Sequence, residues 1–355
     1  GVLDNVDGTV AIGASALGAL TSGTANVAMG YKAGYAVTEA AGNTVIGYEA
    51  LMTDTGSGGG RNTALGYRAL KVFEYAAASG YNTAIGWSSL LVSTSGIENT
   101  CVGASTAVAI ETGDGNVMVG SGAGSSTVDV DNTVIIGKAA AQGIMTSAAD
   151  GTIAIGVSAL TALTSGAGNT AIGYQALAEH TTGSRNIAIG ANAMNGTAGD
   201  ADDAPASTDN VFIGYDAGGG DWEDDEDSNF NVGIGNYVMD AAMDGALNNT
   251  AVGHLALSIL TGGDFNTIFG GNAGGGITTG SNNVMIGYSA GNHNVATADG
   301  IKNVIIGSYA DTSATDSNEQ IAIGYDCQGV GDNTATLGIG ANTASIEING
   351  SNTSW

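Results

Sequence analysis

Short apolar segments that end in glycine recur along almost the whole chain. The clearest copies read Asn-Thr-Ala-Ile-Gly, as at Asn82–Gly86 and Asn169–Gly173. Ten of the eighteen spacings between the nineteen closing glycines are 17 residues. The closing glycines are Gly13, Gly30, Gly47, Gly66, Gly86, Gly103, Gly120, Gly137, Gly156, Gly173, Gly190, Gly214, Gly235, Gly253, Gly270, Gly287, Gly307, Gly324 and Gly338. Such a fixed short period predicts an all-β parallel β-roll or β-solenoid of about 19 coils.

Each copy has a fixed pattern when positions are counted from its closing glycine, which is position 0. Position −1 is Ile, Val, Leu, Met or Phe in every copy, and position −3 is Val, Thr or Ile in every copy except Ala335. Position −2 is most often Ala. Positions −1 and −3 face one way in a strand and position −2 faces the other. Because neither face carries a charge, we expect both to be buried, as in a parallel sheet covered on both sides.

A second segment follows the glycine and reads Tyr-x-Ala-Leu in copies such as Tyr67–Leu70 and Tyr174–Leu177. A Thr/Ser-Gly turn then closes the coil, as at Thr181–Gly183. Glycine is suited to such turns because it adopts backbone conformations that strain other residues. The pattern predicts two short strands and two turns per coil, which is a flattened β-roll.

Position −4 is Asn in fourteen copies. Stacked coils align identical side chains, so we expect the amides to form a ladder in which each one bonds to the next. A catalytic role makes little sense for a residue repeated in this way, and the structural interpretation is favoured. The residues that we assign to this ladder include Asn26, Asn43, Asn62, Asn82, Asn169, Asn186 and Asn303.

A roll this narrow has a thin interior, so the second apolar face of the strands needs a cover from outside the coil. Other copies of the chain around a three-fold axis provide one with closed symmetry. We therefore expect a homotrimeric rod, about 90 Å long if each coil adds ~4.8 Å. A single-chain solenoid that stacks end to end is the alternative.

The net charge of −27, with only seven Lys and Arg, restricts the partners of the chain. Nucleic acids and anionic membrane surfaces both require basic contacts, and we predict neither as a partner. No apolar run approaches the length of a membrane span, so we predict no membrane insertion. The two cysteines, Cys101 and Cys327, lie in distant copies and are predicted to be small core residues.

Insertions into the 17-residue frame predict loops at 54–60, 71–81, 196–209, 218–230 and 291–302. Two of these loops are adjacent and rich in carboxylates, and no Lys or Arg lies between Arg185 and Lys302. Hard cations with oxygen ligands would neutralise them, which makes Ca²⁺ the candidate metal. A solvated acidic loop is an equal alternative. The candidate metal ligands are Asp200, Asp202, Asp203, Asp221, Asp224, Asp225 and Asp227.

Aromatic residues in the loops are candidates for ligand contact. Trp222 and Glu223 lie in one acidic loop, and Phe73 and Tyr75 lie in another loop. An aromatic face stacks on a sugar ring while a carboxylate accepts hydroxyl hydrogen bonds. The alternative, that the ring pins its loop to the roll, is favoured for Trp222, and the second loop has the same two interpretations. The aromatic residues that recur at position +1 are interpreted as a structural ladder on the surface.

Enzymatic chemistry has little support in the sequence. The three histidines, His180, His254 and His293, lie in separate copies, so no catalytic triad or zinc set is visible. Carboxylate pairs for glycoside hydrolysis can be drawn in 221–227, but so many acids lie there that any pair fits. We predict that the chain is not an enzyme.

The repeats resemble two known families. Asn-(Ser/Thr)-(Val/Ala)-(Ala/Ile)-Gly is similar to the left-handed parallel β-roll heads of YadA-type trimeric autotransporter adhesins. The longer Asn-Thr-Ala-Ile-Gly-Tyr-x-Ala-Leu form, at 82–90 in part and 169–177 in full, resembles repeats of phage tail fibres. Residues 341–355 follow the array at 1–340 and resemble the segment before a self-cleaving intramolecular chaperone.

The resemblance implies a structural and adhesive fibre that contacts a host cell surface, located in a virion or outside the cell. Its implied partners are further copies of itself, other fibre or virion components, and a host surface glycan or protein. A bacterial surface adhesin or extracellular filament subunit is the first alternative. A polysaccharide-degrading tailspike is the second.

Overall fold

The computed structural model describes residues 6–54, 60–74, 80–197, 206–222, 226–294 and 297–348. The chain is all-β and forms a parallel β-solenoid of about 18 turns with a period of ~17 residues, which confirms the predicted fold class. Its coils form two compact units, Gly1–Ile172 and Gly173–Trp355. In the described residues no helix is long and apolar enough to span a membrane.

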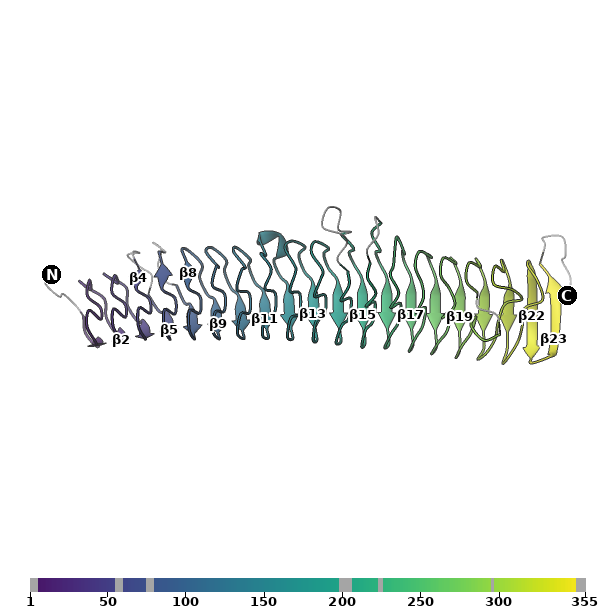
Figure 1. Ribbon diagram of the computed structural model, residues 1–355, viewed down its shortest axis with the longest axis horizontal. Helices are drawn as coiled ribbons and strands as arrows, with labels where there is room; N and C mark the ends of the chain where they lie inside the picture. The colour runs from purple at the N-terminus through teal and green to yellow at the C-terminus, as the bar shows by residue number, and fades with distance from the viewer. Residues whose placement is uncertain are drawn as a thin grey trace. The chain divides into compact units, whose positions relative to one another are not determined.

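Unit 1 is a stack of narrow coils, and each coil adds one three-residue strand to a parallel sheet (Figure 1). The strands of this sheet are β1 (Val10–Ile12), β2 (Val27–Met29), β3 (Thr44–Ile46), β5 (Thr63–Leu65), β7 (Thr83–Ile85), β9 (Thr100–Val102), β10 (Val117–Val119), β11 (Val134–Ile136), β12 (Ile153–Ile155) and β13 (Thr170–Ile172). A second, three-stranded sheet joins β4 (Thr53–Asp54), β6 (Val72–Phe73) and β8 (Val92–Ser93). One 3-10 turn, η1, covers Ser147–Ala149.

Unit 2 repeats this architecture and ends in a hairpin (Figure 1). Its strands are β14 (Ile187–Ile189), β15 (Val211–Ile213), β16 (Val232–Ile234), β17 (Thr250–Val252), β18 (Thr267–Phe269), β19 (Val284–Ile286), β20 (Val304–Ile306), β21 (Ile321–Ile323), β22 (Thr334–Ile339) and β23 (Asn342–Glu347). The last strand pairs antiparallel with β22 and covers its edge. Part of the predicted C-terminal segment at 341–355 is therefore a strand.

The strands pair in the register that the closing glycines predict. Ala28 pairs with Val45 and Ile135 pairs with Ala154, and all of these are position −2 residues. Position −2 is buried in each strand of the main sheet from β2 to β21 and forms the interior of the coil. Positions −1 and −3 are half-buried or exposed. The face that carries position −2 is therefore buried within one chain. The described residues leave the other face open, and its burial by a cover from outside the coil stays a prediction.

Within each unit, the closing glycines form a spine along which successive coils touch. From Gly13 to Gly324 their φ angles lie between +129° and +147°, a region that side chains disfavour. A Cβ atom added at Gly103 would also lie 2.5 Å from the carbonyl oxygen of Gly120 in the next coil. Two independent constraints thus require glycine at this position.

The segment after each closing glycine is mostly a stacked turn and not the second strand that we predicted. In a typical copy Arg68 (φ 56°) and Leu70 (φ 46°) are left-handed. The Leu70 N–H still donates to the Ser89 carbonyl of the next coil at 2.9 Å. Coil-to-coil hydrogen bonds are therefore kept without an extended backbone, because left-handed residues turn the chain within a 17-residue period.

Candidate functional site

The asparagine ladder runs through the interior of both units. All fourteen position −4 asparagines are at most 1% exposed. In unit 1 the Oδ1 of Asn99 accepts a hydrogen bond from the Asn116 backbone N–H at 3.0 Å, and the Asn116 Nδ2 donates to Asn99 Oδ1 at 2.9 Å. In unit 2 Asn283 and Asn303 repeat this pattern at 3.0 Å in both bonds. These amides join consecutive coils, so their role is structural.

The acidic loops of 196–209 and 218–230 lie partly outside the described residues, as do Asp200, Asp202, Asp203, Asp224 and Asp225. The remaining candidate metal ligands, Asp221 and Asp227, are exposed. Across the described parts of the chain no group of three or more His, Cys, Asp or Glu side chains is placed to hold a metal ion. Coordination of Ca²⁺ by these loops stays a prediction.

One carboxylate at the edge of the first acidic loop has a cationic partner, which our sequence reasoning missed. Arg185 makes a two-pronged ion pair with Asp209, with Nε–Oδ1 and Nη2–Oδ2 distances of 2.7 Å. Hydrogen bonds from Arg185 hold the pKa of Asp209 below its usual range. Both residues occupy position −5 of consecutive coils, and so do Lys302 and Glu319, which pair at 2.9 Å. Charges at the same offset were therefore the signal for these pairs.

Two predicted ligand-contact residues are buried. Phe73 is fully buried and Trp222 is 1% exposed. The Trp222 ring meets Phe212 edge-on at a centroid distance of 5.8 Å. Their burial gives both rings a packing role in place of the predicted ligand contact, because neither has a face that a ligand can reach. Glu223 and Tyr75 lie outside the described residues.

The buried titratable groups are held by structural contacts. His180 is fully buried, with Nδ1 3.0 Å from the Thr197 hydroxyl and Nε2 3.0 Å from the Gly183 carbonyl. Both cysteines are free and buried, and burial raises the pKa of Cys101 to about 12. A thiol with that pKa is protonated at neutral pH and is a poor nucleophile.

We expect His180 to make the folding stability depend on pH. Burial lowers the pKa of His180, whereas the imidazole of an unfolded chain has a pKa of about 6.5. The unfolded state therefore binds the proton more readily, and the free energy of unfolding decreases as the pH falls below about 6.5. Urea unfolding of the wild type and of His180→Gln between pH 7.5 and 5 will measure this. An equally steep decrease in the variant would contradict the assignment.

An exposed aromatic ladder crosses four consecutive coils of unit 1. The rings of Tyr31, Tyr48, Tyr67 and Trp87 stack nearly parallel, with centroids separated by 5.2, 5.3 and 6.3 Å and interplanar angles of 23°, 9° and 7°. We call these four residues the unit 1 ladder. All four occupy position +1, so neighbouring rings leave the backbone at the same place and meet face to face.

Aromatic clusters in unit 2 have a different geometry. Tyr215 and Tyr237 meet at 73°, and Tyr288 and Tyr309 meet at 85°. Tyr237 and Tyr309 occupy position +2, whereas their neighbours occupy +1. The offset of one residue rotates the side-chain direction and produces edge-on contacts. Our prediction of a single stacked ladder therefore holds only for its unit 1 part.

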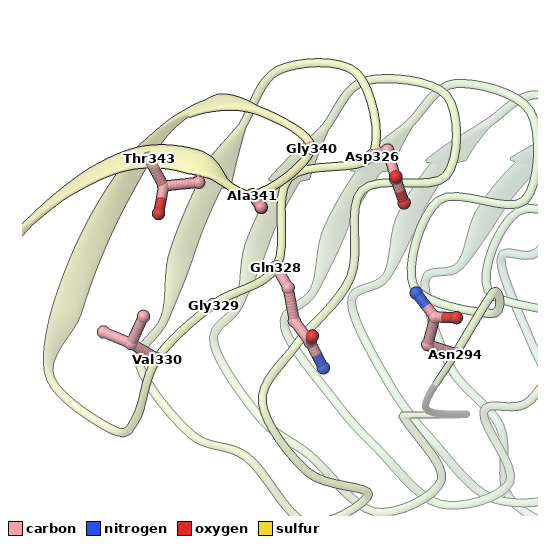
Figure 2. Close-up of a pocket in the computed structure, with 8 residues that line it drawn as sticks. All are labelled: Asn294, Asp326, Gln328, Gly329, Val330, Gly340, Ala341 and Thr343. Carbon is pink, nitrogen blue, oxygen red and sulfur yellow. The ribbon is translucent and has the colours of Figure 1, made fainter.

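A polar cleft of about 350 Å³ lies near the end of unit 2. Figure 2 shows Asp326, Gln328 and Asn294 around it, with Thr343 and the turn between β22 and β23 on the far side. The cleft offers one carboxylate and two amides, which are hydrogen-bonding groups for a polar ligand. Its lining contains no histidine, cysteine or serine.

No protein-family model matches the chain, and no curated protein matches it either. The class that the fold itself defines is a parallel β-solenoid built from repeats of about 17 residues.

Proposed function

We propose that the chain forms the shaft of a homotrimeric structural and adhesive fibre, of the phage tail-fibre type, which contacts a host cell surface. Such a fibre belongs to a virion or lies outside the cell. The observation that carries the proposal is the uncovered outer face of the main sheet in both units. This face consists of the position −1 and −3 side chains, and we call it the outer sheet face.

The outer sheet face is apolar yet open to solvent in a single chain. Ile12, Met29 and Leu65 in unit 1 are 52%, 43% and 41% exposed. Phe269 and Ile286 in unit 2 are 49% and 42% exposed. Soluble proteins rarely expose apolar patches that continue over many strands, and such patches mark interaction sites. Every coil places similar side chains at positions −1 and −3, so the outer sheet face of one copy can pack against the same face of another. This favours copies of the same chain as the cover.

Adhesion follows from the trimer by multivalency. Three copies of each exposed loop and ladder lie along one fibre, so a repetitive surface can be bound at several points at once. The net charge of −27 is consistent with an extracellular, cation-rich medium in which surface charges are screened. The asparagine ladder and the glycine spine support the mechanical part of the role, because they join consecutive coils within each unit.

The experiment that tests the trimer places a charge on the outer sheet face. We expect Phe269→Glu to shift the protein from trimer to monomer in sedimentation velocity, because the interface then has to bury an unpaired carboxylate. Ile259→Glu is the matched control: Ile259 is 44% exposed but lies at position +6, away from the main sheet. The control should sediment like the wild type. Identical sedimentation of both variants and the wild type would refute the proposed interface.

A further inference from the structure

We propose that the unit 1 ladder, together with its flanking cations, is a binding surface for an anionic polysaccharide. The inference rests on the proposed function, because it assumes that the fibre meets a cell surface, and it names the chemical class of the surface ligand. It places the contact on the ladder and not on the acidic loops.

Charge singles out this part of the chain. Residues 31–87 hold four of the seven cations but only four of the 34 carboxylates. The Arg68 guanidinium lies 5.0 Å from the centre of the Tyr67 ring, and the Lys32 ammonium lies 5.3 Å from that of Tyr31. On a chain of net charge −27, this is the region where an anionic polymer meets the least repulsion.

Glu49 does not cancel the cations beside the ladder. Its carboxylate lies 3.0 Å from Arg68 Nε and 3.3 Å from Lys71 Nζ. Burial opposes the ionisation of Glu49, but the two cations outweigh it and keep its pKa below the usual value. One carboxylate thus lies between two cations and fixes the position of Arg68, while Lys32 lies at the far end of the ladder.

The stacked geometry determines what the rings present to solvent. Inner rings cover the faces of one another, so they expose their edges, which carry partial positive charge, and their phenol hydroxyls. Trp87 ends the ladder and is 56% exposed, because the next coil has Ala104 at position +1. The outer face of the Trp87 ring is therefore available for stacking on a sugar ring. The ring edges and hydroxyls of the inner tyrosines, together with Lys32 and Arg68, can bind carboxylate groups further along the polymer.

The same register in unit 2 lacks cations. Lys32 and Arg68 follow two of the ladder tyrosines in unit 1, and Glu49 follows a third. In unit 2 the residues after the position +1 tyrosines are Gln175, Asp216, Ser289 and Asp326. The unit 2 rings also meet edge-on. Stacked rings with cations therefore occur together in unit 1, and neither feature is required by the repeat itself.

The test measures steady-state binding of the 355-residue chain to immobilised polygalacturonate, with neutral dextran and a (dT)20 oligonucleotide as comparison polymers. We expect the wild type to bind polygalacturonate, with an affinity that falls as salt is added, and not to bind dextran. Trp87→Ala and Arg68→Gln should each weaken binding about tenfold, as loss of an interface hot spot does. The matched controls are Tyr174→Ala, a 54% exposed position +1 ring, and Lys302→Gln, a cation in an exposed ion pair. Both controls should stay within about twofold of the wild type.

Four binding results would overturn the proposal. They are no binding to polygalacturonate, equal binding to dextran, equal weakening by the control variants, or binding to (dT)20 that is at least as tight. The native mass of every variant separates this inference from the proposed fibre. A trimer that does not bind polygalacturonate contradicts only the ladder, and a monomer that binds it contradicts only the trimer. Loss of the trimer in Trp87→Ala would place the ladder in the subunit contact and would also overturn the proposal.

Discussion

Gly103→Ala is expected to lower the local free energy of unfolding by about 3–5 kcal/mol, because it combines backbone strain with overpacking. Gly103 has a φ of +142°, and an added Cβ would lie 2.5 Å from the Gly120 carbonyl oxygen. That oxygen belongs to the backbone of the next coil and has no rotamer through which to move away. The Gly120 amide donates to the Val102 carbonyl at 2.8 Å. Its native-state hydrogen exchange measures the decrease in the local free energy of unfolding.

Gly151→Ala is the matched control for this prediction. Gly151 also has a positive φ, +69°, but no heavy atom lies within 4 Å of an added Cβ. Only the left-handed backbone penalty of about 1 kcal/mol applies there. If Gly103→Ala and Gly151→Ala lose the same amount of hydrogen-exchange protection, contact between coils does not explain why glycine is required in the spine.

Asn116→Ala is expected to destabilise unit 1 by about 3–5 kcal/mol, because several buried polar groups lose their partners at once. Asn116 Oδ1 accepts hydrogen bonds from the Thr133 N–H at 3.0 Å and from the Thr133 hydroxyl at 2.7 Å. Its Nδ2 donates to the Val130 carbonyl at 2.7 Å and to Asn99 Oδ1. The shift of the guanidinium midpoint, at unchanged slope, measures this loss.

Asn116→Thr separates the loss of hydrogen bonds from the loss of volume. Four coils carry threonine at this ladder position, among them those of Thr133 and Thr152, so a hydroxyl is compatible with the stack. We expect the threonine variant to lose about half as much stability as the alanine variant, since it keeps one hydrogen-bonding group. An alanine variant as stable as the wild type would show that the amides do not hold the coils together.

The strand register could be predicted from the sequence because every copy places glycine after the same apolar triplet. Insertions did not disturb it: Ala188 and Phe212, separated by 24 residues, still pair at position −2. Even the last closing glycine, Gly338, keeps the register, with Ala335 opposite Ile321. Period and glycine position together determine which residues stack.

The second segment was predicted less well than the outer sheet face, for physical reasons. A roll this narrow predicts that its outer face has no cover within one chain, and positions such as Ile12 are indeed exposed. The Tyr-x-Ala-Leu segment has strand-like composition, yet the short period requires left-handed turns at residues such as Leu70. Local propensity gives way to the need to close the coil.

Side-chain roles depended on offsets that composition does not show. Trp222 and Phe73 lie in loops whose chemistry suggested ligand contact, but each packs into the interior. The pairs Arg185–Asp209 and Lys302–Glu319 share position −5, and the parallel stacking of Tyr48 on Tyr67 follows from their shared position +1. Aligning every charged or aromatic residue on its closing glycine predicts these contacts, because stacked coils bring equal offsets together.

The native mass of the purified protein tests the central claim most directly. Native mass spectrometry should give three times the chain mass of 34.6 kDa, because the proposed fibre covers the outer sheet face with three copies around a three-fold axis. A stable species of 34.6 kDa at micromolar concentration would contradict the trimeric fibre.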